Sequence, residues 1–589
     1  MIRRGLDAVV VLLVACLLLM LAFGGVDIGL GPLQLRLHDW SRPLVLLAVA
    51  LGTRAWLASA FAPHAAATDK RRASTSAADA ATADRPLAPR APVAPYLVTC
   101  ALLALLLAIG VAYTQHHVRF AGGLDSYGYV SAAALLASGH LTEPQKLVTL
   151  LPFEDAPAAA APLGYVPGPD RRTSVPRFPL GLPLVMAVFR IFGPNGPFFV
   201  PLLMSFGTFA LAYVMAKQPG MPAAGIFAAI LVAADPLMVH YGVQPMSDVP
   251  ATFWLIAALW LRLERPQWGI ASGLCAGMAI LTRPALIPAV VVLALVTVDP
   301  SSIRPTIRFG ATLCAFVIVQ MALNLVLYGN IRSSGYGPVA NMFQLSGARV
   351  AANVSNFGKW LTYSHTALIW LVWPAGLIVL RHRAWAWQIS AVVAAAAAPY
   401  FFYLVFDDWE SSRFLLPAIV LILILFARAL AVALSPHPSH PPTRLALRRA
   451  SLSYLVLMLL AFLWAMTSHR FLEREGVYRF ASVESKYALV GEWFKTHTPE
   501  RAVVLAGLHS GSIRFYGQRE TIRWDQIPAD KLEATLRNLR DRGYDPYLAL
   551  DVPSEPPLFQ ARFGSQRSAA AEQIARVRVV NIYKFVSAY

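Results

Sequence analysis

Apolar stretches close to the roughly 20 residues that a helix needs to cross a bilayer recur from the N-terminus to about residue 468. Water cannot be the main solvent of this chain, because 57% of its residues are hydrophobic and only 14% are charged. We therefore expect a polytopic α-helical membrane protein with about 13 transmembrane helices. The expected helices lie at residues 8–24, 43–60, 96–114, 197–216, 222–240, 248–263, 268–282, 284–298, 309–328, 366–381, 386–405, 414–434 and 451–468.

Basic residues favour one orientation in the membrane. If the N-terminus is cytoplasmic, every turn on that side holds a cation, as the positive-inside rule requires. This distribution accounts for the net charge of +18 without a nucleic-acid partner. The orientation depends on two crossings between residues 268 and 298, where Thr282-Arg283-Pro284 could instead mark one bent helix. The cytoplasmic cations are Arg3, Lys70, Lys217, Arg262, Arg304, Arg381 and Arg444 with their neighbours.

The apolar pattern divides the chain into four parts. A transmembrane hairpin at 1–61 and a flexible cytoplasmic linker at 62–95, rich in Ala, Pro, Ser and Thr, precede a transmembrane module at 96–468. Helix-like and strand-like segments alternate in 469–589, which predicts a small C-terminal α/β extracytoplasmic domain. Large outer loops are expected at 115–196 and 329–365.

The site of any chemistry is expected outside the cytoplasm. The C-terminal domain has no phosphate-binding loop, nucleophile elbow or metal pattern, so an accessory role is expected for it. All four cysteines lie in or beside apolar stretches without metal-ligand spacing. The absence of disulfide-like cysteines from the outer parts and the Ala/Pro/Arg-rich composition suit a bacterial inner membrane.

An acid opens the first large outer loop, in the sequence Gly122-Gly123-Leu124-Asp125-Ser126-Tyr127. A carboxylate just past a membrane helix is well placed to take a proton from a hydroxyl while a lipid tail stays in the bilayer. Asp125 is therefore our first candidate for a catalytic base, with Tyr127 as a neighbouring substrate contact. An Asp before an apolar run is also a common helix cap, and that reading stays open.

Several further motifs follow Asp125 in order. They are Arg177-Phe178-Pro179-Leu180-Gly181-Leu182-Pro183-Leu184, Met246-Ser247-Asp248-Val249-Pro250, the segment from Gly273 to Arg283-Pro284, and Arg413-Phe414-Leu415-Leu416-Pro417. With them, residues 96–434 resemble the GT-C glycosyltransferases, in the branch that contains protein O-mannosyltransferases and lipid A aminoarabinose transferases. No single motif is specific to that family.

The resemblance implies a donor sugar carried on a polyprenyl phosphate and an extracytoplasmic lipid, glycan or protein as the acceptor. The acceptor would attack the anomeric carbon with inversion, and polyprenyl phosphate would leave. The leaving phosphate needs cations, for which Arg171, Arg172, Arg177, Lys359 and Arg413 are outer-face candidates, with an interfacial cation as the alternative. The family often has two adjacent acids where this chain has Asp125-Ser126, so no cofactor is certain and a divalent metal stays open.

Four other residues complete the expected substrate site. Asp248 starts a membrane helix and could instead cap it. Arg283 lies near the end of an apolar stretch and needs a partner, which could be a structural acid or a phosphate. His365 lies in the second large outer loop. Asp408 belongs to an acidic turn just before Arg413.

Two other classes of membrane protein would require different sequence features. A transporter or flippase of a lipid-linked or polar solute would favour charged or broken helices near the bilayer midplane and two matching halves, and neither is found. A membrane scaffold or sensor would not need the Asp125 loop or the outer cations. The sequence therefore favours a membrane glycosyltransferase.

Overall fold

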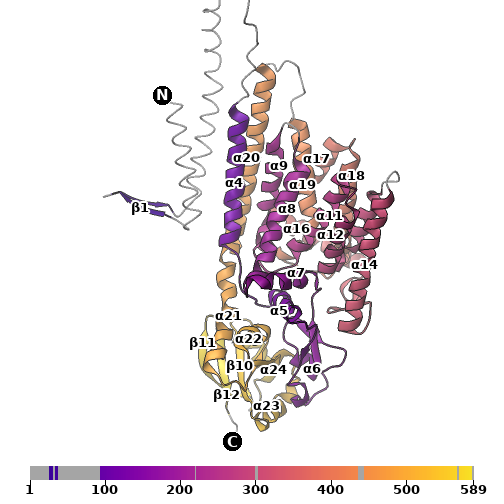
Figure 1. Cartoon of the computed structure of the whole chain (residues 1–589). Helices are drawn as coiled ribbons and strands as arrows, with labels where there is room; N and C mark the ends of the chain where they lie inside the picture. Colours follow the sequence, from indigo (N-terminus) through magenta and orange to yellow (C-terminus); the bar gives the residue numbers. More distant parts are fainter. Residues whose placement is uncertain are drawn as a thin grey trace, which may run out of the picture.

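The computed structural model describes residues 26–30, 33–37, 93–218, 221–298, 303–434, 444–566 and 569–586. A bundle of helices stands on a smaller part that contains the C-terminal sheet (Figure 1). The helices expected at 8–24 and 43–60 and nearly all of the linker at 62–95 lie outside the described residues. Between those two expected helices, strands β1 (Val26–Leu30) and β2 (Leu33–Leu37) pair antiparallel.

A helix lies at each expected span that falls within the described residues. Five of these helices are long and apolar enough to cross a membrane alone, and up to seven if each bent pair forms one span. The polytopic helical architecture is therefore present, whereas the count of about 13 is not confirmed. The helices are α4 (Val93–Gln115), α8 (Phe199–Ala216), α9 (Pro222–Ala233), α10 (Pro236–Gly242), α11 (Asp248–Glu264), α12 (Gly269–Thr282), α13 (Ile287–Val296), α14 (Ile303–Tyr328), α16 (Gly347–His365), α17 (Ile369–Leu380), α18 (Ala384–Phe401), α19 (Leu416–Leu434) and α20 (Arg444–Arg474).

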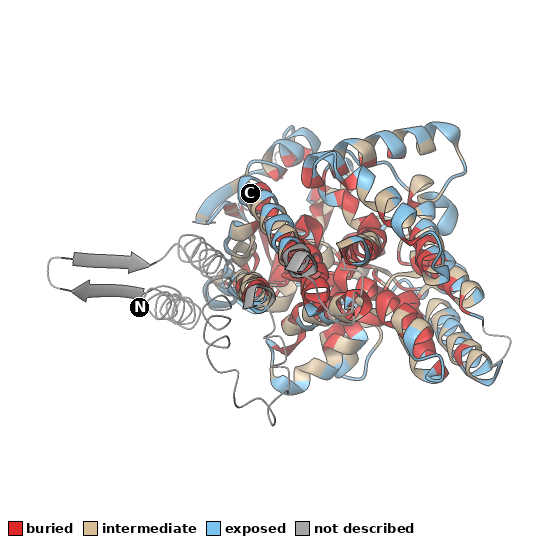
Figure 2. Ribbon diagram, turned by 90° about the horizontal axis from the view of Figure 1, so that it is seen from above, coloured by how far each residue is buried: buried red, intermediate tan, exposed pale blue. Residues whose placement is uncertain are grey.

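The outer surface of the bundle is apolar. Buried residues gather at the centre of the bundle and exposed ones at its periphery (Figure 2). Helix α14 shows this most clearly, since only Phe309 and Leu327 are buried while side chains such as Ile318 and Val326 are exposed. Exposing this much apolar surface to water is unfavourable, so lipid is the solvent that suits it.

Two pairs of consecutive helices are joined by sharp bends, one of them inside the span expected at 222–240. Helices α9 and α10 meet at 67°, where buried Asp235 accepts hydrogen bonds from the N–H groups of Leu237 and Met238, both at 3.0 Å. An Asp cap followed by Pro236 starts a new helix in this way. Helices α16 and α17 meet at 89°. Much of the loop expected at 329–365 is therefore the helix α16.

Contacts at both ends of α11 show how residues 268–298 run. Arg283, which follows α12, lies 2.6 Å from Asp248 at the start of α11. Arg262, near the end of α11, donates to the hydroxyl of Thr297, which follows α13, at 3.0 Å. Helix α12 therefore returns to the start of α11 and α13 runs back to its end. The two helices cross the bundle in opposite directions, with Thr282-Arg283-Pro284 as the turn between them.

The C-terminal part is a five-stranded sheet with strand order β11-β12-β10-β8-β9. Strand β8 is parallel to β9 and β10, and β12 is antiparallel to β10 and β11. Every residue of β8 is buried, as expected for a central strand. The elements are α21 (Phe480–His497), β8 (Ala502–Ala506), α22 (Ser510–Gly517), β9 (Glu520–Ile522), α23 (Leu532–Asp541), β10 (Asp545–Asp551), α24 (Glu555–Phe563), β11 (Ala571–Val577) and β12 (Val580–Phe585).

The first large loop lies between the bundle and the C-terminal sheet (Figure 1). Its helix α5 packs against α7 on one side and α22 on the other. Gly181 at the start of α7 touches the backbone of Leu281 and Thr282, where a β-carbon would lie 2.3 Å from the Thr282 nitrogen. The elements of this loop are α5 (Asp125–Ala137), β3 (Glu143–Pro144), α6 (Ala156–Ala160), β4 (Tyr165–Pro167), β5 (Thr173–Pro176) and α7 (Gly181–Phe189).

Candidate functional site

Two acids and two arginines from four segments meet at the end of the bundle that carries α5. Asp125 Oδ2 lies 3.3 Å from both Nη1 and Nη2 of Arg413, and Asp248 Oδ1 lies 2.6 Å from Arg283 Nη2. Both guanidinium groups lie over the ring of Phe414, at 5.5 Å for Arg283 and 5.4 Å for Arg413. We call these two acids and two arginines the acid–arginine cluster.

Neither acid caps its helix. The N-cap positions of α5 and α11 are Leu124 and Ser247, and neither makes a capping hydrogen bond through its side chain. Asp125 and Asp248 instead occupy the first turns, where the positive end of the helix dipole stabilises a carboxylate. Both side chains are therefore free to pair with the arginines, and the capping interpretation of the sequence is not what the structure shows.

Tyrosines that the sequence analysis missed complete the cluster. The hydroxyl of Tyr129 donates to Ser247 Oγ at 2.8 Å, and Arg413 lies 5.4 Å from the ring centroid of Tyr241. Burial, followed by the negative charge of Asp125, raises the pKa of Tyr129, so it stays a neutral hydroxyl. Residues four apart share a face of a helix. That spacing from Asp125 could have pointed to Tyr129 rather than Tyr127.

Besides Arg177, four of the sequence candidates lie outside the cluster. Lys359 pairs with exposed Asp407 at 2.9 Å, and Asp408 accepts a hydrogen bond from the Ser411 N–H at 2.6 Å, which shapes the turn before Arg413.

His365 Nε2 lies 2.7 Å from Asp235 Oδ2, with both side chains fully buried. This partner was not anticipated from the sequence. Lys359, Asp408 and His365 each have a partner within the protein, and their expected role at a substrate site stays a prediction. Tyr127, the fourth, packs against the C-terminal domain, as described below.

Arg177 has a different environment from the paired arginines. Its guanidinium lies 5.4 Å from the ring centroid of Tyr336, its Nε is buried without a hydrogen-bond partner, and within the described residues no acid lies at ion-pair distance. It borders a pocket of about 450 Å³ formed with the segments 166–169 and 333–337. An uncompensated cation beside a pocket is suited to an anionic ligand.

Aromatic contacts connect this pocket to the cluster. The ring of Tyr336 lies 5.8 Å from that of Phe178, which in turn lies 4.9 Å from that of Tyr129. The rings of Tyr336, Phe178 and Tyr129 therefore form a continuous series of contacts from Arg177 to the cluster.

The C-terminal domain holds the chain on both sides of Asp125. Tyr127 packs on Gly511, where a β-carbon would lie 2.3 Å from the tyrosine ring, and its ring centroid is 6.4 Å from that of Phe515. Before Asp125, the Ala121 N–H donates to the Tyr516 hydroxyl at 2.8 Å. Helix α5 thus presents Asp125 to the bundle and Tyr127 to the sheet domain.

An acid of the C-terminal domain lies beside the same segment. A β-carbon on Gly122 would lie 2.7 Å from a carboxylate oxygen of Glu484, so only glycine fits there. Burial raises the pKa of Glu484 to about 7, with Lys486 opposing the shift and Asp551 adding to it. The charge next to the Asp125 segment therefore changes near neutral pH.

The described residues contain no group of three or more His, Cys, Asp or Glu side chains arranged to hold a metal ion. Asp125 and Asp248 are each paired with an arginine, which already neutralises their charge. The structure therefore assigns no metal ligands within the part of the chain that it describes.

Comparisons with known proteins show which family and which fold this chain is similar to. Residues 176–323, which include Arg177, Asp248 and Arg283, match the family model of dolichyl-phosphate-mannose-protein mannosyltransferases. The crystal structure of ArnT from Cupriavidus metallidurans bound to undecaprenyl phosphate is 14% identical, with a TM-score of 0.50, and the alignment covers 83% of this chain and 98% of ArnT. The chain has the fold of the GT-C glycosyltransferases.

Two other solved structures are also similar to this chain. ArnT from the same organism in the apo state is 14% identical over 82% of this chain and 97% of its own, with a TM-score of 0.51. The arabinofuranosyltransferase AftD from Mycobacteria is 15% identical over 82% of this chain and 40% of its own, with a TM-score of 0.46. No curated protein sequence matches this GT-C-like chain.

Proposed function

We propose that this protein is an integral membrane glycosyltransferase that moves a sugar from a polyprenyl-phosphate donor to an extracytoplasmic acceptor, with inversion. The observation that carries the proposal is the acid–arginine cluster, which places Asp125 against Arg413 at one end of a GT-C fold. The positive-inside rule assigns the opposite end of the bundle to the cytoplasm. The cluster, the first loop and the C-terminal domain then lie on the extracytoplasmic side.

Asp125 is the proposed base. Its Oδ2 is held by Arg413, while its Oδ1 accepts no hydrogen bond from the described residues. Oδ1 is thus available to take the proton of an acceptor hydroxyl. The acceptor oxygen then forms a bond to the anomeric carbon, and the bond from that carbon to the phosphate oxygen breaks. The electron pair leaves with polyprenyl phosphate, and attack from the opposite face inverts the configuration.

Arg177 is the proposed contact for the donor phosphate. Arg283 and Arg413 are already paired with acids, whereas the charge of Arg177 is uncompensated and borders the pocket beside Tyr336. A planar guanidinium can contact two phosphate oxygens at once, and it stabilises the negative charge that grows on the leaving group.

The proposal is tested by transfer with purified full-length protein in nanodiscs. Polyprenyl-phosphate sugars with different head groups would be supplied together with total envelope lipids and glycans as acceptors. Release of polyprenyl phosphate and appearance of a sugar-modified acceptor are expected with one donor. If no donor is consumed while a fluorescent polyprenyl-phosphate sugar is moved between leaflets, the protein is a flippase and the proposal is wrong.

Arg177→Gln is expected to raise the KM for the donor about tenfold or more, because a hydrogen bond to a charged group is worth roughly 1.5–3 kcal/mol. Donor titrations at saturating acceptor measure the change. Arg172→Gln is the matched control, since Arg172 is an exposed cation of the same loop. An equal effect of both substitutions would show that only the general surface charge matters.

Gly511→Ala is expected to lower kcat roughly 10- to 100-fold, because the new β-carbon displaces Tyr127 and with it α5, and a misplacement of about 1 Å can cost that much. Rates at saturating substrates measure the effect. Gly310→Ala is the control, since nothing lies within 4 Å of a β-carbon there. An unchanged kcat in the Gly511 variant would show that the contact between the C-terminal domain and Tyr127 has no effect on catalysis.

A further inference from the structure

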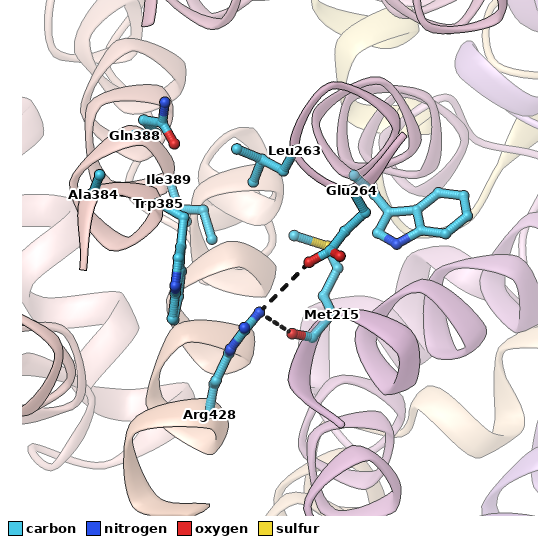
Figure 3. A pocket seen from close by; sticks show the side chains of 9 residues that line it. Met215, Leu263, Glu264, Ala384, Trp385, Gln388, Ile389 and Arg428 are labelled. Carbon is cyan, nitrogen blue, oxygen red and sulfur yellow. Dashed lines mark hydrogen bonds and ion pairs between the residues drawn. The ribbon is translucent and has the colours of Figure 1, made fainter. Parts of the chain in front are cut away.

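A second pocket, drawn in Figure 3, has a volume of about 280 Å³. It lies at the other end of the bundle from the acid–arginine cluster. Glu264 borders it and is the last residue of α11, whose first residue is Asp248 of the cluster. A helix of this length separates its two ends by roughly 25 Å. The second pocket therefore belongs to the opposite membrane surface and has no part in the proposed transfer.

Arg428 of α19 points into this pocket with its polar groups only partly satisfied. Its Nη1 donates to the carbonyl of Met215 at 2.8 Å, and its guanidinium stacks over Trp385 at 3.9 Å. Glu264 Oε1 is at 4.0 Å, the limit for an ion pair, and its side chain is half exposed. Figure 3 shows the two side chains converging across the opening. The Nε of Arg428 is buried and has no hydrogen-bond partner among the residues that the structure describes.

The charge around the pocket is positive. Arg383 lies near enough for its charge to act on Arg428. Two further cations, Lys217 and Arg265, are the C-cap residues of the neighbouring helices α8 and α11. A single weakly bound Glu264 does not balance these cations. An anionic group is therefore the ligand that the site attracts.

The rest of the lining is suited to lipid. Trp260 and Trp385 lie on two of the bordering helices, with Leu263 and Met215 between them. Tryptophan is enriched at the level of lipid headgroups because its ring is apolar and its N–H is polar. Basic pockets between transmembrane helices on the cytoplasmic side are known to hold anionic headgroups.

We propose that this pocket binds the phosphate group of an anionic phospholipid of the inner leaflet. Arg428 contacts the phosphate through its guanidinium group, Trp260 and Trp385 flank the glycerol region, and the acyl chains lie along the apolar outer surface of the bundle. The site does not depend on the proposed sugar transfer. It would hold lipid equally in a protein with no transferase activity.

Native mass spectrometry of the full-length protein tests this proposal. Protein in detergent would receive phosphatidylglycerol, phosphatidylcholine or inorganic phosphate at increasing concentrations. We expect retained phosphatidylglycerol, at least tenfold weaker retention in Arg428→Gln, and no loss in Arg308→Gln, which removes an exposed cation of α14. Equal losses in both variants, equal retention of phosphatidylcholine, or displacement by inorganic phosphate would each overturn the proposal.

Arg428 also joins α19 to α8 through Met215, so its removal could disturb folding. Trp385→Leu keeps that contact and removes only the stacked ring, and it is expected to weaken phosphatidylglycerol retention severalfold. Unchanged retention in the Trp385 variant would overturn the proposal even if Arg428→Gln protein aggregates.

Discussion

Asp125→Asn is expected to lower kcat for sugar transfer by about 10²- to 10⁴-fold, the usual contribution of a positioned general base. An amide has nearly the volume of the carboxylate and can still accept a hydrogen bond from Arg413, but it cannot take a proton. Because the donor contacts are unchanged, the KM for the donor should stay within about twofold of wild type. Steady-state rates in nanodiscs measure both quantities.

Asp407→Asn is the matched control for this substitution. Asp407 is an exposed acid on the same side of the bundle, and its partner is Lys359 rather than an arginine of the cluster. It should leave kcat unchanged. Transfer by the Asp125→Asn protein at a near-normal rate would remove Asp125 from the role of base, whatever its effect on stability.

Asp248→Asn is expected to destabilise the protein by about 3–5 kcal/mol, the cost of leaving a buried charge without its partner. Asp248 is 1% exposed and Arg283 13% exposed, so water cannot replace the lost carboxylate. Equilibrium unfolding in mixed micelles, followed by tryptophan fluorescence, measures the change. The loss of the ion pair also frees the turn after α12, so kcat should fall together with stability.

An exposed ion pair provides the comparison for the Asp248 result. Lys359→Gln breaks the pair with Asp407, in which the two side chains are 55% and 65% exposed, and should destabilise the protein much less than Asp248→Asn, because water screens exposed charges. The double variant Asp248→Leu/Arg283→Leu should recover much of the stability lost in Asp248→Asn, because no unpaired charge remains. If the Lys359 and Asp248 substitutions lower the free energy of unfolding equally, the Asp248–Arg283 pair does not behave as a buried ion pair.

The sequence predicted the helices and the end of the bundle that holds the site, because long apolar stretches and basic turns act locally. It also selected Asp125, Asp248, Arg283 and Arg413 as candidate residues of one site. It could not pair them, since Asp125 and Arg413 are 288 residues apart and their contact depends on how helices pack. The contact of His365 with Asp235 was not predictable either, because the two residues lie 130 positions apart in the sequence.

In the C-terminal domain too, the strands could be predicted from the sequence, whereas a long-range contact could not. The strands at Ala502–Ala506 and Asp545–Asp551 follow from short runs of apolar residues with polar residues on either side, a signal that acts locally. The contact of Gly511 with Tyr127 had no local signal, because a glycine in a loop or helix can serve many purposes. The position of this domain against the Asp125 segment was therefore not predictable from the chain alone.

Analysis of the lipid-linked sugars in living cells tests the central claim most directly. Cells that lack this protein, and cells that carry only Asp125→Asn, should accumulate the same polyprenyl-phosphate sugar, whereas cells carrying Gly310→Ala should not. The head group that accumulates would identify the donor. If neither the deletion nor Asp125→Asn causes any polyprenyl-phosphate sugar to accumulate, the proposed glycosyltransferase function is contradicted.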